Sequence, residues 1–297
     1  MFSYSGFIVV IVCVVAGFLM EGGNIHVLFQ PVELLIIGGA CIGSIIVASS
    51  PHLMKQMVQQ IIMIGKGTGV NKEKYMQLLK LFYELFKIAA SNPIAIEQHV
   101  DKPESSELFK KYPAVLRDHH AMTFICNTLL LQISSSISPY DLEDLMDQDI
   151  QTVHAEESVT PETLNRVADA LPGLGIVAAV IGIIIVMGKL SQGKETIGHS
   201  VAVALVGTFL GVLLCYGFVQ PLAARIKTNI EENGKVLVVI KIALLSYVKG
   251  MNPKVCVEFA RRAIPMEHRP SFSEVEAALS KAKEAGAGAQ AGGAKAA

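Results

Sequence analysis

Side chains that could move protons or ions are sparse in the apolar parts of this chain. The segment ADALPGLGIVAAVIGIIIVMG, residues 168–188, has Asp169 and Pro172 near one end and no ionisable group in its middle. A second apolar segment, 200–221, carries the hydroxyl of Thr208 at mid-depth. Both segments are long enough to cross a bilayer.

The other ionisable groups near apolar segments are expected at their edges. Glu33 stands at the outer edge of the segment 34–50, and His199 lies just outside 200–221. A charge inside a membrane is costly and is kept for function. Because no span has one at its centre, the chain alone cannot carry a proton across by a side-chain relay. The sequence therefore predicts that a partner supplies the titratable group.

Two prolines lie near the expected cytoplasmic ends of spans. Pro172 is expected in the opening turns of its helix and Pro221 at the end of its own. One interpretation is that both are ordinary helix-boundary prolines. The other is that they form a flexible joint, which passes motion between the membrane helices and the cytoplasmic ones.

Composition places these segments in a membrane protein. The 297 residues are 52% hydrophobic and 17% charged, and the net charge of −1 gives no signature of nucleic-acid binding. Four runs have bilayer-spanning length: 2–20, 34–50, 168–188 and 200–221. We expect an all-α integral membrane protein with four transmembrane helices in two hairpins and a helical cytoplasmic domain.

Lysine and arginine near the spans predict the orientation. They gather at the start of the polar block after the second span and of the tail after the fourth, which favours the cytoplasm for both pieces and both termini. The first span lacks a cleavage site and is expected to remain as an anchor. The expected domains are hairpin one at 1–50, a cytoplasmic helical domain at 51–166, hairpin two at 167–222, cytoplasmic C-terminal helices at 223–280 and a disordered Ala/Gly tail at 281–297.

The polar block is predicted to be helical. Apolar side chains recur at helical spacing in 72–90 and in 114–133. Helix starts are expected at Ser138 and again at Thr160, each followed by a proline. The recurring side chains are Tyr75, Leu78, Leu79, Phe82, Leu85 and Phe86 in the first stretch and Met122, Ile125, Leu129 and Ile133 in the second.

Small residues form rows on three of the spans, which allows helices to approach closely in lipid. These rows could pack against the chain's own helices or against other subunits. The rows are Gly39 and Gly43; Gly175, Ala178, Ala179 and Gly182; and Gly207, Gly211 and Cys215.

No enzyme constellation is present in the sequence. The glycines do not form a phosphate-binding loop, and His119 and His120 are adjacent, which suits a shared metal poorly. The five cysteines lack metal-site spacing and are interpreted as packing residues. We expect no catalytic residue, no metal and no cofactor.

Four ordered motifs resemble the MotA family of flagellar stator subunits, within the wider MotA/TolQ/ExbB proton channel family. They are QPVELLIIGGACIGS, LPGLGIVAAVIG, VALVGTFLGVLLCYGFVQPLA and VEFARRAIPMEHRPSF, and the resemblance runs from residue 1 to about residue 280. It implies an inner-membrane homo-oligomer, a pentamer around a MotB dimer. MotB would carry the essential aspartate, and ion flow would turn the ring against the rotor protein FliG.

The resemblance also implies roles for individual residues. Pro172 and Pro221 match the family's functional prolines, and Asp169 matches a nearby acid. Ala179 stands where sodium-driven relatives have a threonine, whereas Thr208 matches a threonine found in both kinds. Protons are therefore favoured over sodium as the coupling ion.

The rotor-facing charges match the family only in part. Glu97 matches a glutamate, but Ala89, Ala90 and Ser91 stand where an arginine would fall, and Lys87 is the nearest cation. A lysine is a flexible point charge rather than a guanidinium fork, so it replaces the arginine only approximately.

Three alternatives remain open at this point. An ExbB/TolQ-like energiser shares the ring-around-an-acid logic but usually has three spans. A small secondary transporter would need a midplane substrate site, which the sequence does not display. A structural scaffold would need no partner acid.

Overall fold

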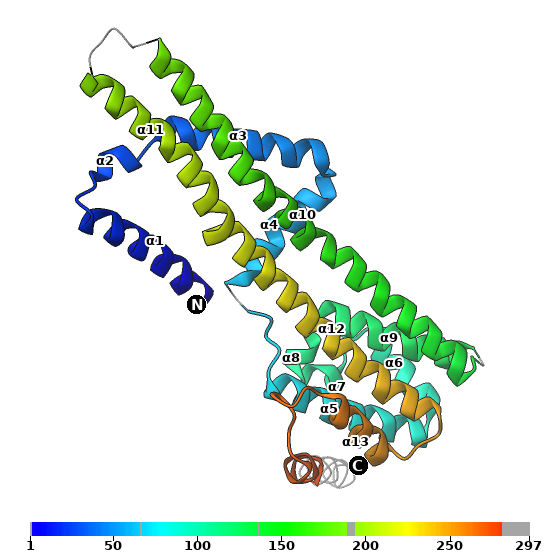
Figure 1. The fold of residues 1–297 in the computed structure, drawn as a ribbon. Helices are drawn as coiled ribbons and strands as arrows, with labels where there is room; N and C mark the ends of the chain where they lie inside the picture. The colour runs from blue at the N-terminus through cyan, green and yellow to red at the C-terminus, as the bar shows by residue number, and fades with distance from the viewer. Residues whose placement is uncertain (1, 66, 136, 189–193, 281–297) are drawn as a thin grey trace. The chain divides into compact units, whose positions relative to one another are not determined.

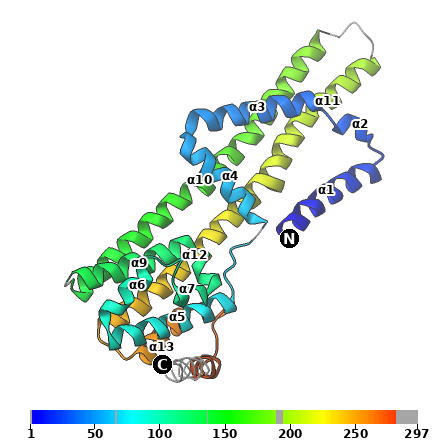
Figure 2. The same ribbon diagram turned by 180° about the vertical axis from the view of Figure 1, so that it is seen from behind.

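The structure is a computed structural model that describes residues 2–65, 67–135, 137–188 and 194–280. These residues form helices and turns, with no strand among them (Figures 1 and 2). They divide into two compact units that interleave along the chain. Unit one is Met1–Gly67 with Glu156–Ile230, and unit two is Thr68–Ala155 with Glu231–Ala297. The domain boundaries expected from the sequence stay predictions, and the expected tail at 281–297 lies outside the described residues.

Unit one contains the apolar helices. Two long helices, α10 and α12, contribute residues to both units. The elements of unit one are α1 (Phe2–Met20), α2 (Ile25–Leu28), α3 (Pro31–Ala48), α4 (Pro51–Ile64), the later part of α10 (Pro139–Met187), α11 (Lys194–Leu213), a π-helical turn (Leu214–Val219) and the start of α12 (Gln220–Val248).

Local sequence explains where the shorter helices of unit one begin. The backbone N–H of His26 donates to the side chain of Asn24, which caps α2. Pro31 occupies the start of α3, and Ser50 caps α4 by accepting from the N–H of Leu53.

Three helical stretches are long and apolar enough to cross a membrane, and they lie at Ile25–Ala48, Pro139–Met187 and Ser200–Val248. The apolar stretch of α1, Tyr4–Met20, is shorter. The all-α membrane architecture is therefore confirmed, whereas the count of four spans stays a prediction.

Three proline expectations were wrong. Helix α10 runs without a break through Pro161 and Pro172, so neither the expected start at Thr160 nor the placement of Pro172 in opening turns holds. Pro221 does not end its helix either, because α12 follows the π-helical turn directly. That wider turn gives the proline ring room against the preceding carbonyl groups. Packing of the neighbouring helices outweighs the local preference that each proline expresses.

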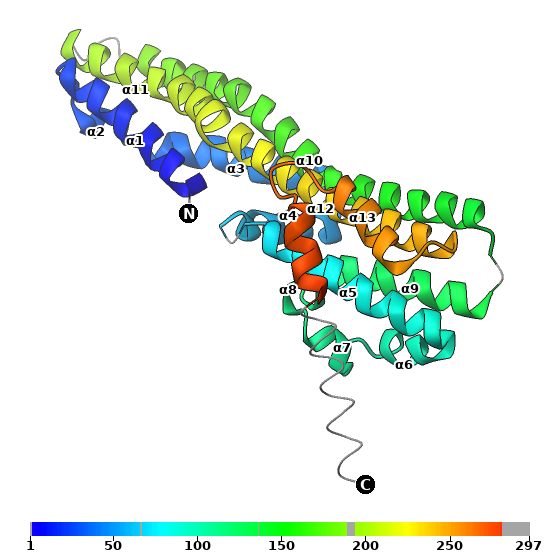
Figure 3. The ribbon, with the colours of Figure 1, turned by 90° about the horizontal axis from the view of Figure 1, so that it is seen from below.

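Unit two packs around one apolar core, and α5 (Lys72–Ser91) lies against α13 (Pro253–Ala263) (Figure 3). The predicted stripes are confirmed, because the six α5 side chains are buried and so are Met122, Ile125 and Leu129. The other elements are a 3₁₀ turn (Pro93–Ile96), α6 (Glu97–Val100), α7 (Glu107–Lys110), α8 (Pro113–Leu116), α9 (His119–Ser134), the first part of α10, the part of α12 from Glu231 onward and a helix at 272–280.

Polar contacts fix the helix starts in unit two. Asn71 caps α5 and Asp118 caps α9, each through its side-chain oxygen. Lys74 then pairs with Asp118 at 2.7 Å in a largely buried position. An acidic residue of α10 is also paired within the unit, since Nζ of Lys241 lies 2.8 Å from the carboxylate of Asp147.

Candidate functional site

The functional candidates of unit one gather where α10 and α11 touch. A Cβ built on Gly211 would lie 2.6 Å from the carbonyl oxygen of Leu171 and 2.9 Å from the Cα of Gly175. A Cβ on Gly175 would lie 2.7 Å from the carbonyl oxygen of Gly207 and 3.3 Å from the Cα of Thr208. The two helices therefore meet backbone to backbone, which requires glycine on both (Figure 1).

The rows of small residues thus serve packing within the chain on α10 and α11. The contact continues at Gly182, where a built Cβ would lie 2.7 Å from the Cβ of Ala204. On α3, in contrast, a Cβ built on Gly39 or Gly43 meets nothing within 4 Å. Nothing in the described structure packs against that row. Packing within the chain therefore accounts for the small residues of α10 and α11, whereas those of α3 remain free to contact another subunit.

Glu33 lies deeper in unit one than its position at the edge of an apolar run predicts. It lies in the first turn of α3, is only 6% exposed, and its Oε2 atom has no hydrogen-bond partner among the described residues. A Cβ built on Gly207 would lie 2.8 Å from that atom. Gly207 stands seven residues inside the expected span 200–221, about 10 Å along a helix. The carboxyl therefore lies well inside that span and not at its edge.

The sequence carries only a weak signal for this placement. A carboxylate directly before an apolar run usually faces water, and only the glycine at 207 hints at room for it. Since the pairing of α3 with α11 is a long-range contact, periodicity along the chain could not reveal it. An ionisable group in such a position is by default a functional candidate.

The predicted acid and prolines lie along the same helices. The side-chain amide of Gln220 donates to Asp169 at 3.3 Å, which links α10 to the residue before Pro221. Asp169 and Pro221 are exposed and Pro172 is half-buried. The structure therefore brings the acid and one proline close together at one level of unit one.

Ala179 and Thr208 occupy facing helices. Ala179 is buried, and its backbone nitrogen would lie 3.1 Å from a Cβ built on Gly207. Thr208 is half-buried and follows that glycine directly. Among the described residues, no group of three His, Cys, Asp or Glu side chains could hold a metal ion. Ala179 and Thr208 therefore lie at the contact between α10 and α11.

The two candidates for rotor contact lie in unit two. Lys87 is on α5 and Glu97 opens α6; both side chains are exposed. Within the described ranges, neither makes an ion pair. Both charges are therefore available to another molecule.

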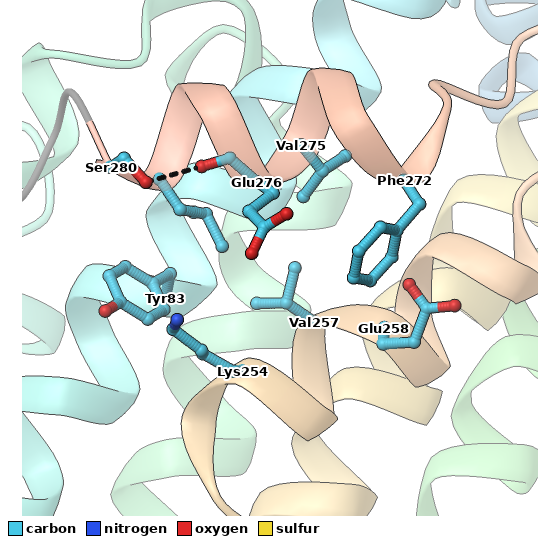
Figure 4. Close-up of a pocket in the computed structure, with 9 residues that line it drawn as sticks. Tyr83, Lys254, Val257, Glu258, Phe272, Val275, Glu276 and Ser280 are labelled. Atoms are coloured by element: carbon cyan, nitrogen blue, oxygen red, sulfur yellow. Dashed lines mark hydrogen bonds between the residues drawn. The ribbon is translucent and has the colours of Figure 1, made fainter.

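A small cleft lies between α13 and the helix at 272–280 (Figure 4). Val257 and Val275 form part of its apolar wall, and Lys254 and Glu258 contribute charges. Hydrogen bonds from Arg261, with a smaller contribution from Arg262, lower the pKa of Glu258 to about 2. This carboxylate therefore stays ionised and committed to its arginines, so it cannot serve as a general acid.

Comparison with known families gives two matches. Residues 4–93 match the description "Motility protein A N-terminal", and residues 117–237 match the "MotA/TolQ/ExbB proton channel family". The chain is 39% identical to Motility protein A of Salmonella typhimurium over 272 residues, which cover 91% of this chain and 92% of that protein. It is 38% identical to Motility protein A of Escherichia coli with the same coverage.

Two solved structures share the fold. The C. jejuni MotAB structure matches with a TM-score of 0.75 at 19% identity, covering 91% of this chain and 98% of that one. The flagellar MotAB stator complex from Bacillus subtilis matches with a TM-score of 0.72 at 21% identity, covering 90% and 96%. The resemblance seen in the sequence motifs is confirmed.

Proposed function

This chain belongs to the motility protein A family and is a flagellar stator subunit, and we propose that, with a MotB-type partner, it conducts protons and converts their flow into torque on the rotor. One observation carries the proton pathway: α10 and α11 form a tightly packed apolar pair, and Glu33 is the buried carboxylate set against it. One carboxylate at one depth makes no relay across a membrane. The partner supplies the essential aspartate.

The assembly we propose is a ring, a pentamer around a MotB dimer, in the bacterial inner membrane. The similar solved structures are MotAB complexes, which supports MotB as the partner. The open glycine row on α3 and the exposed apolar side chains of α10 leave surface for neighbouring chains and lipid. The four-span topology would place both termini and unit two in the cytoplasm. There Lys87 and Glu97 would meet a rotor protein of the FliG type.

Residues 4–93 match the N-terminal region of motility protein A, and this match favours a flagellar stator over an ExbB/TolQ-type energiser. In this proposal Pro172 and Pro221 form the joint that passes motion from the membrane helices to unit two, beside Asp169. Ala179 and Thr208 line the helix pair along which the proton passes.

The coupling ion can be tested by swimming. A methyl group at Ala179 offers no oxygen ligand, and sodium is a hard cation that prefers oxygen. Cells driven by this stator should swim at unchanged speed when sodium is replaced by potassium, and they should stop when a protonophore is added. Swimming that depends on external sodium and resists the protonophore would contradict proton coupling.

Glu33 should affect ion flow more than assembly. Glu33→Gln keeps the shape of the side chain beside Gly207 but removes its titratable carboxyl group, so we expect swimming speed to fall several-fold with the complex still assembled. Glu33→Asp keeps the carboxylate and should retain more motility than Glu33→Gln. Equal motility of Glu33→Gln and the parent would make the buried carboxyl a packing residue only.

A further inference from the structure

A groove of about 320 Å³ opens in unit one beside the π-helical turn. Phe7 and Val10 of α1, Ile64 of α4 and Leu222 of α12 supply apolar walls. Phe7 is held in place by stacking on Phe218, with ring centroids 5.4 Å apart. Residues from three helices that are distant in the sequence thus form the walls of one apolar groove.

Arg225 is the one charged residue among those lining this groove. Its Nε atom is buried and has no hydrogen-bond partner, and the guanidinium makes no ion pair within the described part of the chain. A guanidinium carries five N–H donors in a fixed fork. A buried donor left unpaired is unfavourable, and more so when it is charged. The native state should therefore provide an anion at this position.

The groove and the cation together specify the ligand. Arg225 lies four residues beyond Pro221 on α12, about 6 Å along the helix past the expected end of the fourth span. This is the depth of lipid headgroups. A phosphate diester accepts two parallel hydrogen bonds from a guanidinium, and an acyl chain fits apolar walls.

We propose that this groove binds an anionic phospholipid. Its phosphate accepts hydrogen bonds from Arg225, and one acyl chain lies against Phe7 and Val10. The bound lipid contacts Pro221, so lipid composition would act on the same turn through which the stator passes motion. A neutral hydrocarbon would leave the guanidinium unpaired, and a free phosphate would leave the apolar walls uncovered.

Native mass spectrometry of the purified complex, with its partner chain present, tests this proposal. Phosphatidylglycerol and phosphatidylcholine with the same acyl chains are titrated separately. The parent complex should bind phosphatidylglycerol at least tenfold more tightly. Arg225→Gln should abolish that preference, whereas Lys227→Gln, which removes an exposed charge two residues away, should keep it.

Gly6→Leu provides a second variant that leaves Arg225 untouched. Gly6 lines the groove, and a Cβ built there meets nothing within 4 Å, so leucine fits and fills the groove. Binding of phosphatidylglycerol should fall at least tenfold in this variant while the amount of complex stays unchanged. The proposal is overturned if the parent binds both lipids equally or if the preference survives Arg225→Gln. It is also overturned if Gly6→Leu binds phosphatidylglycerol as the parent does.

Discussion

Replacing Pro172 with alanine should abolish swimming while leaving the complex assembled in normal amount. Pro172 lies deep inside α10, where its ring nitrogen cannot donate to the carbonyl group of Ala168. An interior proline destabilises a helix by about 3 kcal/mol, so alanine should stiffen the helix and not unfold it. The freed carbonyl must find water or a neighbour in lipid, which marks a point where α10 can bend and hydrate.

Pro161 supplies a matched control on the same helix. It is also an interior proline, eleven residues earlier and outside the expected span. Pro161→Ala should retain most motility, because it restores the same kind of hydrogen bond away from the ion pathway. Swimming speed is measured beside the amount of extracted complex. Full motility of Pro172→Ala would make this proline a passive feature, and lost assembly would make its role structural.

Gly211→Val should remove most of the assembled complex from the membrane. Its Cβ would lie 2.6 Å from the Leu171 carbonyl oxygen and 2.9 Å from the Cα of Gly175. Both are backbone atoms, so neither can move aside as a side chain would. Overpacking costs about 1–3 kcal/mol in a core that can partly adjust, and two helices in backbone contact adjust least. The helices must separate along their whole contact.

Gly173→Ala is the control for this substitution. Gly173 lies on α10 between the contact residues Leu171 and Gly175, but a Cβ built there meets nothing within 4 Å. This variant should accumulate as the parent does and show the same melting temperature in detergent. Gly211→Val with parental amount and stability would mean that α10 and α11 do not pack as described.

The amphipathic part of the fold follows directly from the sequence. Tyr75, Phe82 and Phe86 lie on one stripe of α5, and burial of that stripe depends only on helical period. The capping residues Asn71 and Asp118 fix helix starts through bonds to residues three positions away. These features could be predicted because helical period and capping depend on residues that are close in the sequence.

The continuity of α10 and the depth of Glu33 could not be predicted, because they depend on contacts between residues far apart in the sequence. Pro161 and Pro172 look like helix starts locally, but tertiary contacts keep α10 continuous through both. Glu33 looks like an edge residue until α3 brings it against Gly207. The roles of Asp169, Pro172, Ala179, Thr208 and Pro221 in the ion pathway, and of Lys87 and Glu97 at the rotor, stay predictions that variants must test.

Proton flux into proteoliposomes tests the central claim most directly. Vesicles are made with this chain and its MotB-type partner, with this chain alone, and with a partner in which the aspartate that we propose as the proton carrier is changed to asparagine. An inside-negative potassium diffusion potential drives uptake, and a trapped pH dye reports it. Only the first preparation should acidify, in the absence of sodium. Acidification by this chain alone, or by the asparagine variant at the same rate, would contradict a pathway that depends on the partner's carboxyl group.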